Sequence, residues 1–153
     1  MKKYEFTGET KEIRLLFRTA TLHRIRATVA FGIVEVGDLG GWIEKEENLS
    51  HEGKAWVWGN AEVCGDAKVF SASHVLVIGA IGSRNDFTTF YRDKDNEITV
   101  KCGCFLGKID RFLEKVTQTH GDSKYALVYR AAVEVAKLQI DLSGEAPKDA
   151  DEE

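Results

Sequence analysis

Residues 82–86, with the sequence GSRND, gather several polar groups that could bind a small anion. The guanidinium of Arg84 can hold a phosphate or a carboxylate through two parallel hydrogen bonds. The Ser83 hydroxyl can donate another hydrogen bond, and the Asn85 side chain can bind an amide or a base edge. The same residue types build ordinary turns, in which Arg84 and Asp86 pair with neighbours. We keep the four residues after Gly82 as candidate ligand-binding or partner-binding residues, with a simple turn as the alternative.

His74 and the pair Cys102 and Cys104 could support catalysis or metal binding. A neutral imidazole can act as a general base, so His74 is a catalytic candidate only if the protein transfers acyl groups. Two cysteines separated by one residue fall short of the four ligands of a structural zinc site. Because Ile98 and Val100 lie on the same predicted strand face, we expect both cysteines to be small buried hydrophobic residues. We predict no metal and no cofactor.

Three tryptophans, Trp42, Trp56 and Trp58, could stack on a ligand or pack against protein. Trp56 and Trp58 flank Val57, so in an extended segment with Val57 inward they point outward. Outward tryptophans need cover from another subunit, from the N-terminal residues or from a ligand. We therefore include all three among the candidate ligand-binding or partner-binding residues.

The composition excludes several classes of protein. Hydrophobic residues make up 43% of the 153 residues and charged residues 30%, which is ordinary for a globular chain. Residues 143–153 hold five acidic residues against one lysine, which accounts for the whole net charge of −4. The neutral remainder offers no broad basic surface to nucleic acid. No segment has the ~18 consecutive apolar residues of a membrane span, and we expect no signal peptide.

A branched apolar residue recurs at every sixth position of residues 57–81. The members of this column are Val57, Val63, Val69, Val75 and Ile81. A second column of the same period shifts from large to small residues: Ile43, Leu49, Ala55, Ala61, Ala67, Ser73 and Gly79. A period of six predicts a β-helix coil, because a hairpin alternates every two residues and a helix every 3.6. With roughly three such units to a turn, the coil has about two turns, a short platform for an acyl donor.

The flanking segments predict strands before the coil and a mixed module after it. Residues 20–29 alternate between apolar and polar, and residues 32–36 are rich in β-branched side chains, so each predicts a short strand. Residues 85–104 predict a β-hairpin around a DKDN turn. Two helices are predicted over 105–121 and 123–140. The second is apolar on nearly every side, so we expect a neighbouring subunit to cover part of it.

The stretch LHRIRATVAFGIVEVGDLGGWIEKEENLS, followed by VxGxAxV hexads, resembles a group of small phage and prophage proteins. These proteins place a DLGG-containing β cap before VYGNAxVxGDA-like repeats, and the similarity covers roughly residues 22–77. Residues 78–140 are similar to a recurrent phage-protein module. The resemblance implies provenance and fold more than activity. Left-handed β-helices of this type commonly trimerise around their coil, which implies a homotrimer. The hexads also resemble those of hexapeptide-repeat acyltransferases.

Residues and resemblance together predict a mainly β fold with α-helices. We expect an N-terminal β cap at 1–48, a short left-handed β-helix coil at 49–83, a ββαα module at 84–142 and a disordered acidic tail at 143–153.

For function, we predict a phage-derived binding protein of the host cytoplasm rather than an enzyme. Its partner would be a host protein, for example a CRISPR effector that it inhibits as an anti-defence protein, or a small phosphorylated molecule that it sequesters. We expect no membrane partner and no direct contact with nucleic acid. Two alternatives stay open: a reduced hexapeptide-repeat acyltransferase with His74 as base, and a virion assembly or structural component.

Overall fold

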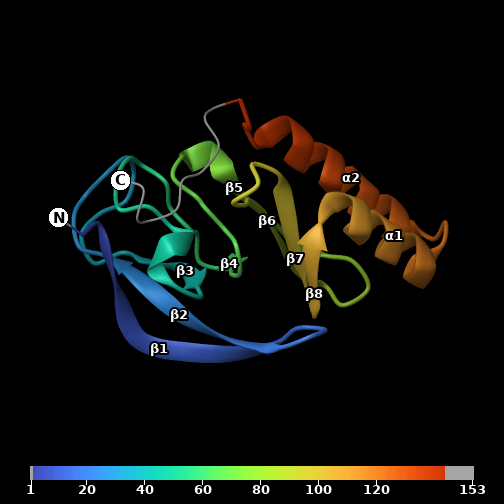
Figure 1. Cartoon of the computed structure of the whole chain (residues 1–153), viewed down its shortest axis with the longest axis horizontal. Helices are drawn as coiled ribbons and strands as arrows, with labels where there is room; N and C mark the ends of the chain where they lie inside the picture. The colour runs from blue at the N-terminus through green and yellow to red at the C-terminus, as the bar shows by residue number, and fades with distance from the viewer. Residues whose placement is uncertain (1, 144–153) are drawn as a thin grey trace.

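The computed structural model describes residues 2–143 and contains two four-stranded sheets followed by two helices (Figure 1). The strands of the first sheet are β1 (Tyr4–Arg14), β2 (Thr19–Ala27), β3 (Leu39–Ile43) and β4 (Glu62–Val63). Those of the second sheet are β5 (Val75–Ile81), β6 (Asp86–Arg92), β7 (Ile98–Cys102) and β8 (Phe105–Lys108). The helices are α1 (Ile109–His120) and α2 (Lys124–Gln139), with short 3₁₀ turns at Glu46–Asn48 and Ala72–His74. The prediction of a mainly β chain with two C-terminal helices is confirmed. The predicted tail, beyond Ser143, lies outside the described residues.

The first sheet begins with a long antiparallel hairpin of β1 and β2, which runs beneath the second sheet (Figure 1). In β2 the side chains of Leu22 and Ile25 are buried, as their predicted strand requires. Strand β1 is not predicted from the sequence, because most of its side chains are polar. Residues 32–36, predicted as a strand, instead continue a turn in which Phe31 and Val34 exchange backbone hydrogen bonds. Gly32 reverses the chain there with a φ of 54°.

Residues 39–69 bring two parallel segments of the chain side by side. Trp42 pairs with Glu62, and an isolated parallel bridge joins Leu49 to Val69. The two segments of each pair are therefore separated by about three hexads. Both predicted columns point inward over this stretch, and their members are at most 1% exposed: Ile43, Leu49, Ala55, Val57, Ala61, Val63, Ala67 and Val69.

The six-residue pattern ends structurally at Val69, although Val75 and Ile81 continue it in the sequence. Val75–Ile81 forms β5, which pairs antiparallel with β6 instead of continuing the parallel pairing of residues 39–69. Four consecutive apolar residues begin β5. Val75 and Val77 pack against the core of the first sheet, whereas Leu76 and Ile78 pack under the helices. Successive half-buried side chains of β5 therefore pack alternately against the two cores, in place of the six-residue pattern, and residues 2–143 contain no stacked solenoid.

The second sheet lies between the first sheet and the helical layer. In β6, Phe90 belongs to the core under the helices and Tyr91 to the core of the first sheet, and both are fully buried. Phe112 of α1 and Val133 of α2 close the helical side. Helix α1 begins at Ile109, four residues later than predicted, because Phe105–Lys108 pairs with β7. Neither helix of the described residues is long and apolar enough to cross a membrane.

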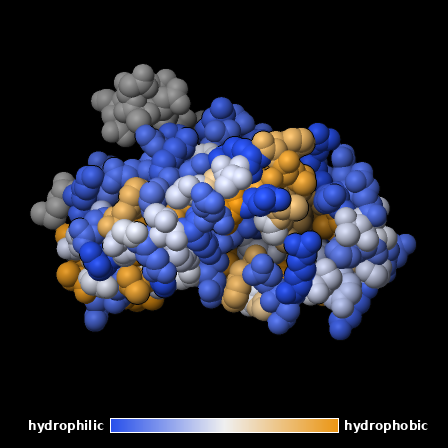
Figure 2. Space-filling view, turned by 90° about the horizontal axis from the view of Figure 1, so that it is seen from below, coloured by the Kyte–Doolittle hydropathy of each residue, from blue (hydrophilic) through white to orange (hydrophobic). Residues whose placement is uncertain are grey.

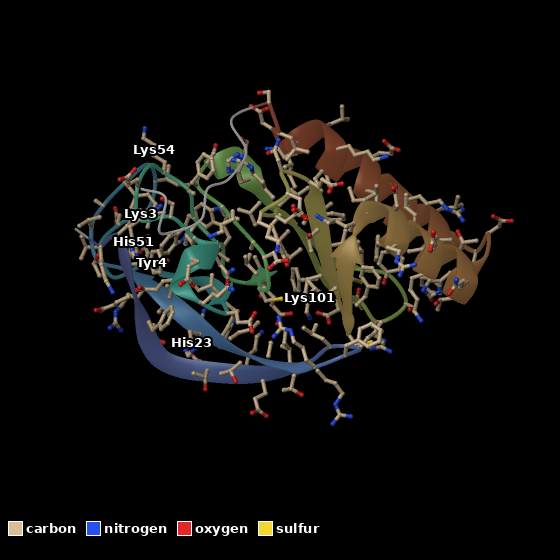
Figure 3. All side chains as sticks on the ribbon, in the orientation of Figure 1. Lys3, Tyr4, His23, His51, Lys54 and Lys101 are labelled. Atoms are coloured by element: carbon tan, nitrogen blue, oxygen red, sulfur yellow. The ribbon has the colours of Figure 1, made fainter. Side chains whose placement is uncertain are left out.

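Polar contacts also join the two sheets. The ammonium group of Lys101, which lies between them in Figure 3, is 2.6 Å from Glu62 Oε1. Lys11 of β1 approaches the other oxygen of Glu62 at 2.6 Å. Burial disfavours the charged carboxylate, but these two lysines outweigh burial and lower the pKa of Glu62. The Tyr91 hydroxyl donates a hydrogen bond to the Cys64 carbonyl at 2.7 Å.

Lys3, Tyr4 and His51, which lie together in Figure 3, connect the start of β1 to residues 49–55. The Lys3 ammonium donates to the Ala55 carbonyl, and the Tyr4 hydroxyl donates to the Leu49 carbonyl at 2.6 Å. The His51 ring stacks on Tyr4 with ring centroids 4.0 Å apart. Burial lowers the pKa of Lys3 to about 8.

Apolar side chains also reach the surface. Seen from below, they form separate patches among polar residues (Figure 2). At the tip of the β1–β2 hairpin, Leu16 is 52% exposed and Phe17 is 97% exposed.

His74 lies at the start of the second sheet and is 5% exposed. The Phe70 backbone N–H donates to its Nδ1 at 3.2 Å, and its Nε2 lies 3.2 Å from Arg92 Nη1. Burial and the Arg92 charge lower the pKa of His74 to about 4. Since an unfolded histidine has a pKa near 6.5, the unfolded chain binds a proton in the interval between about 4 and 6.5 that the folded chain excludes.

We expect acidification from about pH 7 to about pH 5 to lower the free energy of unfolding by about 2 kcal/mol through His74. Chemical denaturation of the native protein and of His74→Gln at several pH values measures this contribution. The variant should lose less stability over the interval. The pKa of His51 is also lowered, but His51 acts equally in both proteins. Equal pH slopes for the two proteins would contradict the prediction.

Candidate functional site

A cavity of about 190 Å³ lies where the second sheet meets the helical layer. We call it the sheet–helix cleft. Its apolar lining comprises Ile81, Phe105, Phe112 and Val116. Its polar lining comprises Ser83, Arg84, Asp86, Thr88, Cys102, Gly103, Cys104, Lys115, Thr119, His120 and Tyr129. The cleft therefore combines an apolar wall with basic, hydroxyl and thiol groups.

Two tight turns bring the strand-borne residues to the cleft. Between β5 and β6, Gly82 has a φ of 79°, and the Asn85 N–H donates to the Gly82 carbonyl at 3.2 Å. Between β7 and β8, Gly103 has a φ of 57°. A β-carbon at Gly103 would lie 3.6 Å from Arg84 Nη1, so the guanidinium rests beside this second turn. Left-handed backbone at both turns favours glycine.

Helix α1 presents one face to the cleft. Phe112, Lys115, Val116 and Thr119 follow the spacing of neighbours on a helix surface. Phe112 and Val116 are buried and anchor the helix to the sheet, whereas Lys115 and Thr119 are exposed. The apolar anchors of α1 thus fix where its ammonium and hydroxyl groups lie.

Tyr129 of α2 forms the closed side of the cleft. Its side chain is 7% exposed and its ring stacks on His120, with centroids 5.7 Å apart and an interplanar angle of 28°. Burial, followed by the neighbouring Cys102 thiol, raises the pKa of Tyr129, so its hydroxyl stays protonated at neutral pH. Gly82 packs directly against this hydroxyl, since a β-carbon there would overlap the tyrosine.

The charges of the cleft favour an anion. Arg84 and Lys115 form no ion pair with a carboxylate within residues 2–143. Asp86, the one acidic residue of the lining, accepts a hydrogen bond from the Phe87 N–H at 2.7 Å. Arg84 and Asp86 therefore do not form an ion pair with each other, and two basic side chains face a single carboxylate.

The structure brings some of the sequence candidates together and separates others. Ser83, Arg84 and Asp86 line the cleft, and Asn85 holds the adjoining turn with a φ of 50°. His74 lies elsewhere, and both of its ring nitrogens have neighbours.

The tryptophans do not contribute to the cleft. Trp42 is covered by Lys11, whose ammonium lies 4.4 Å from the ring centroid. Trp56 is 3% exposed and packs edge-on against Phe31. Trp58 is 48% exposed. Cover from the N-terminal part of the same chain, one of the options foreseen for these residues, applies to Trp42 and Trp56.

Lys115, Thr119 and Tyr129 were absent from the sequence candidates. The sequence holds one indication that Lys115 and Thr119 share a helix face: they flank the apolar stripe of α1 at a spacing of four residues. The two cysteines were expected to be buried, but Cys104 is exposed, Cys102 is half-buried, and both line the cleft. Within residues 2–143, no cluster of three or more His, Cys, Asp or Glu residues suits a metal ion.

No family model and no curated protein matches this sequence. The ligand-binding role of the cleft therefore has to be inferred from the residues and the geometry of this chain.

We expect Gly82→Ala to lower the free energy of unfolding by at least about 1 kcal/mol, the typical cost of left-handed backbone for a residue with a β-carbon. Overlap with Tyr129 adds to this cost. Gly59→Ala is the matched control, because a β-carbon at Gly59 meets no atom within 4 Å. Chemical denaturation of both variants measures the difference, and equal stability of the two would contradict the packing described here.

Proposed function

We propose that this chain binds a small phosphorylated molecule in the sheet–helix cleft. The observation that carries the proposal is the presence of two basic side chains, Arg84 and Lys115, in one cavity with an apolar wall. Arg84 can bind two phosphate oxygens at once, and Lys115 adds a compact positive charge. The Ser83 and Thr119 hydroxyls can donate to the remaining oxygens.

The apolar wall selects the rest of the ligand. Phe105 and Phe112 offer aromatic surface against which a ring of the ligand can pack. A cavity of about 190 Å³ is smaller than the roughly 300 Å³ at which drug-sized sites begin. A phosphate attached to one sugar and one base, as in a nucleoside monophosphate, fits this combination better than a long acyl donor.

Binding without catalysis is favoured by the surroundings of His74, the one general base considered from the sequence. Its Nδ1 accepts from a backbone N–H and its Nε2 faces a guanidinium, so neither nitrogen is free to take a proton from a substrate. Its lowered pKa of about 4 also makes it a weak base.

The fold and the sequence resemblance suggest a biological setting. We infer that residues 39–69 are a reduced coil of the left-handed β-helix kind, supported by its parallel pairings and its inward columns. The resemblance to phage proteins supports a phage-derived protein that acts in the host cell. In that setting, the cleft would sequester a phosphorylated host signal and so counter a host defence.

We expect adenosine 5′-monophosphate to bind and to perturb the amide resonances of residues 82–86 and of α1 in heteronuclear NMR titrations. Inorganic phosphate should shift the same resonances more weakly, because it lacks the ring that packs on the apolar wall. Lys115→Gln should weaken nucleotide binding about tenfold or more, in line with the loss of one hydrogen bond to a charged group.

Arg111→Gln is the matched control. This substitution removes the same charge from the same helix, but Arg111 does not line the cleft. A second readout is the rate at which iodoacetamide alkylates Cys104, which bound nucleotide should slow. If neither probe shifts the cleft resonances nor protects Cys104, or if both glutamine variants weaken binding equally, the proposed function is wrong.

A further inference from the structure

One face of α2 exposes a row of apolar side chains that residues 2–143 leave uncovered. Leu127, Val135 and Leu138 have exposed fractions of 61%, 47% and 89%. Ala131 is exposed between the first two. Spacings of four, four and three residues place these side chains in one stripe along the helix. We call it the α2 stripe.

The position of α2 directs this stripe away from the molecule. The opposite face of α2 packs on the second sheet and α1 through Ala126, Tyr129, Val133 and Ala136. Figure 1 places α2 on the outer side of the helical layer, across the molecule from the β1–β2 hairpin. Rotation of the helix cannot bury the stripe without exposing Tyr129 and Val133, so the cover must come from other atoms.

The C-terminal residues of the chain have the wrong composition to provide that cover. Residues 144–153 read GEAPKDADEE, in which the apolar side chains are two alanines and one proline. Such a segment brings too little apolar surface to cover a stripe of leucine and valine. A second polypeptide chain can supply the apolar surface that this segment lacks.

The residues along the stripe fit a second copy of the same helix in antiparallel orientation. With a two-fold axis at Ala131, Leu127 of each copy lies opposite Val135 of the other, and the two alanines allow close approach of the backbones. Lys124 then lies opposite Leu138, one helical turn from Glu134 of the other copy. Glu134 lies 3.9 Å from Lys137 of its own helix, an exposed contact that leaves its second oxygen available. Lys124 is also exposed, so each copy can give and receive one interhelical ion pair.

We propose that the α2 stripe is a self-association surface, through which two copies of this chain pair with α2 antiparallel. The cleft stays open in this pair, because Tyr129 faces the opposite side of the helix. This pair is two-fold, which differs from the trimer that the sequence resemblance implies, and it does not depend on the proposed ligand.

Sedimentation velocity between about 10 µM and about 1 mM tests the pairing, a range chosen because a single helix pair makes a small interface. The mass of the native protein should rise from 17.1 kDa toward twice that value. Leu127→Glu should remain at 17.1 kDa throughout. Ile33→Glu is the matched control, since Ile33 is 84% exposed but lies outside α2, and it should associate like the native protein.

Charge exchange tests the orientation of the two helices. Lys124→Glu and Glu134→Lys should each weaken association, because each places like charges one turn apart across the two-fold axis. The double variant should restore it. In a parallel pair these positions are ten residues apart along the helix, and the double variant would restore nothing.

Circular dichroism at the lowest concentration checks that every variant is folded. A native protein that stays monomeric, a mass of three copies, or association that Leu127→Glu leaves intact would each overturn the proposal.

Discussion

The burial of the second sheet on both faces is the constraint on which the remaining structure depends. Strand β6 carries this constraint, since Phe90 packs under the helices while the next residue, Tyr91, packs into the core of the first sheet. A strand covered on both sides needs apolar residues at successive positions, and Val75–Ile78 provides them in β5. The two layers on either side are therefore positioned relative to one shared sheet. The Tyr91 hydroxyl bond to Cys64 and the Lys101 contact with Glu62 fix that arrangement.

The sheet–helix cleft is a consequence of how the helical layer meets the end of this sheet. Chain reversals at Gly82 and Gly103 end the strands beside α1 and α2, where no further apolar residue fills the space. The polar side chains that edge the space come from the two turns and from the exposed flank of α1. The apolar wall belongs to the same core that holds the helices, so the site and the fold share Phe112 and Val116.

Much of the first half of the fold could be predicted from the sequence. The columns of residues six apart identify the inward side chains up to Val69, because the parallel pairing of residues 39–69 buries them at that period. The same rule fails at Val75, where a sheet covered on both faces buries neighbouring residues alternately. Strand β1 could not be predicted, because its polar residues show no periodicity that distinguishes an outer strand from a loop.

The site was predictable only in its local part. Arg84 could be predicted as a binding residue from the GSRND turn alone, because an arginine beside serine and asparagine can bind an anion whatever lies around it. Lys115 and Tyr129 join it from helices roughly thirty and forty-five residues away in the sequence, and only the packing of α1 and α2 on the sheet determines that they meet.

The contact between Lys101 and Glu62 also limits how this protein can evolve by exchange of its parts. Lys101 belongs to the C-terminal sheet and is 6% exposed. Its carboxylate partner, Glu62, belongs to β4 of the first sheet. Recombination that joined this C-terminal half to an unrelated N-terminal half would leave a buried ammonium group without a counter-charge, at a cost of several kcal/mol. The two halves are therefore inherited as one unit unless the incoming half brings its own acidic residue to that place.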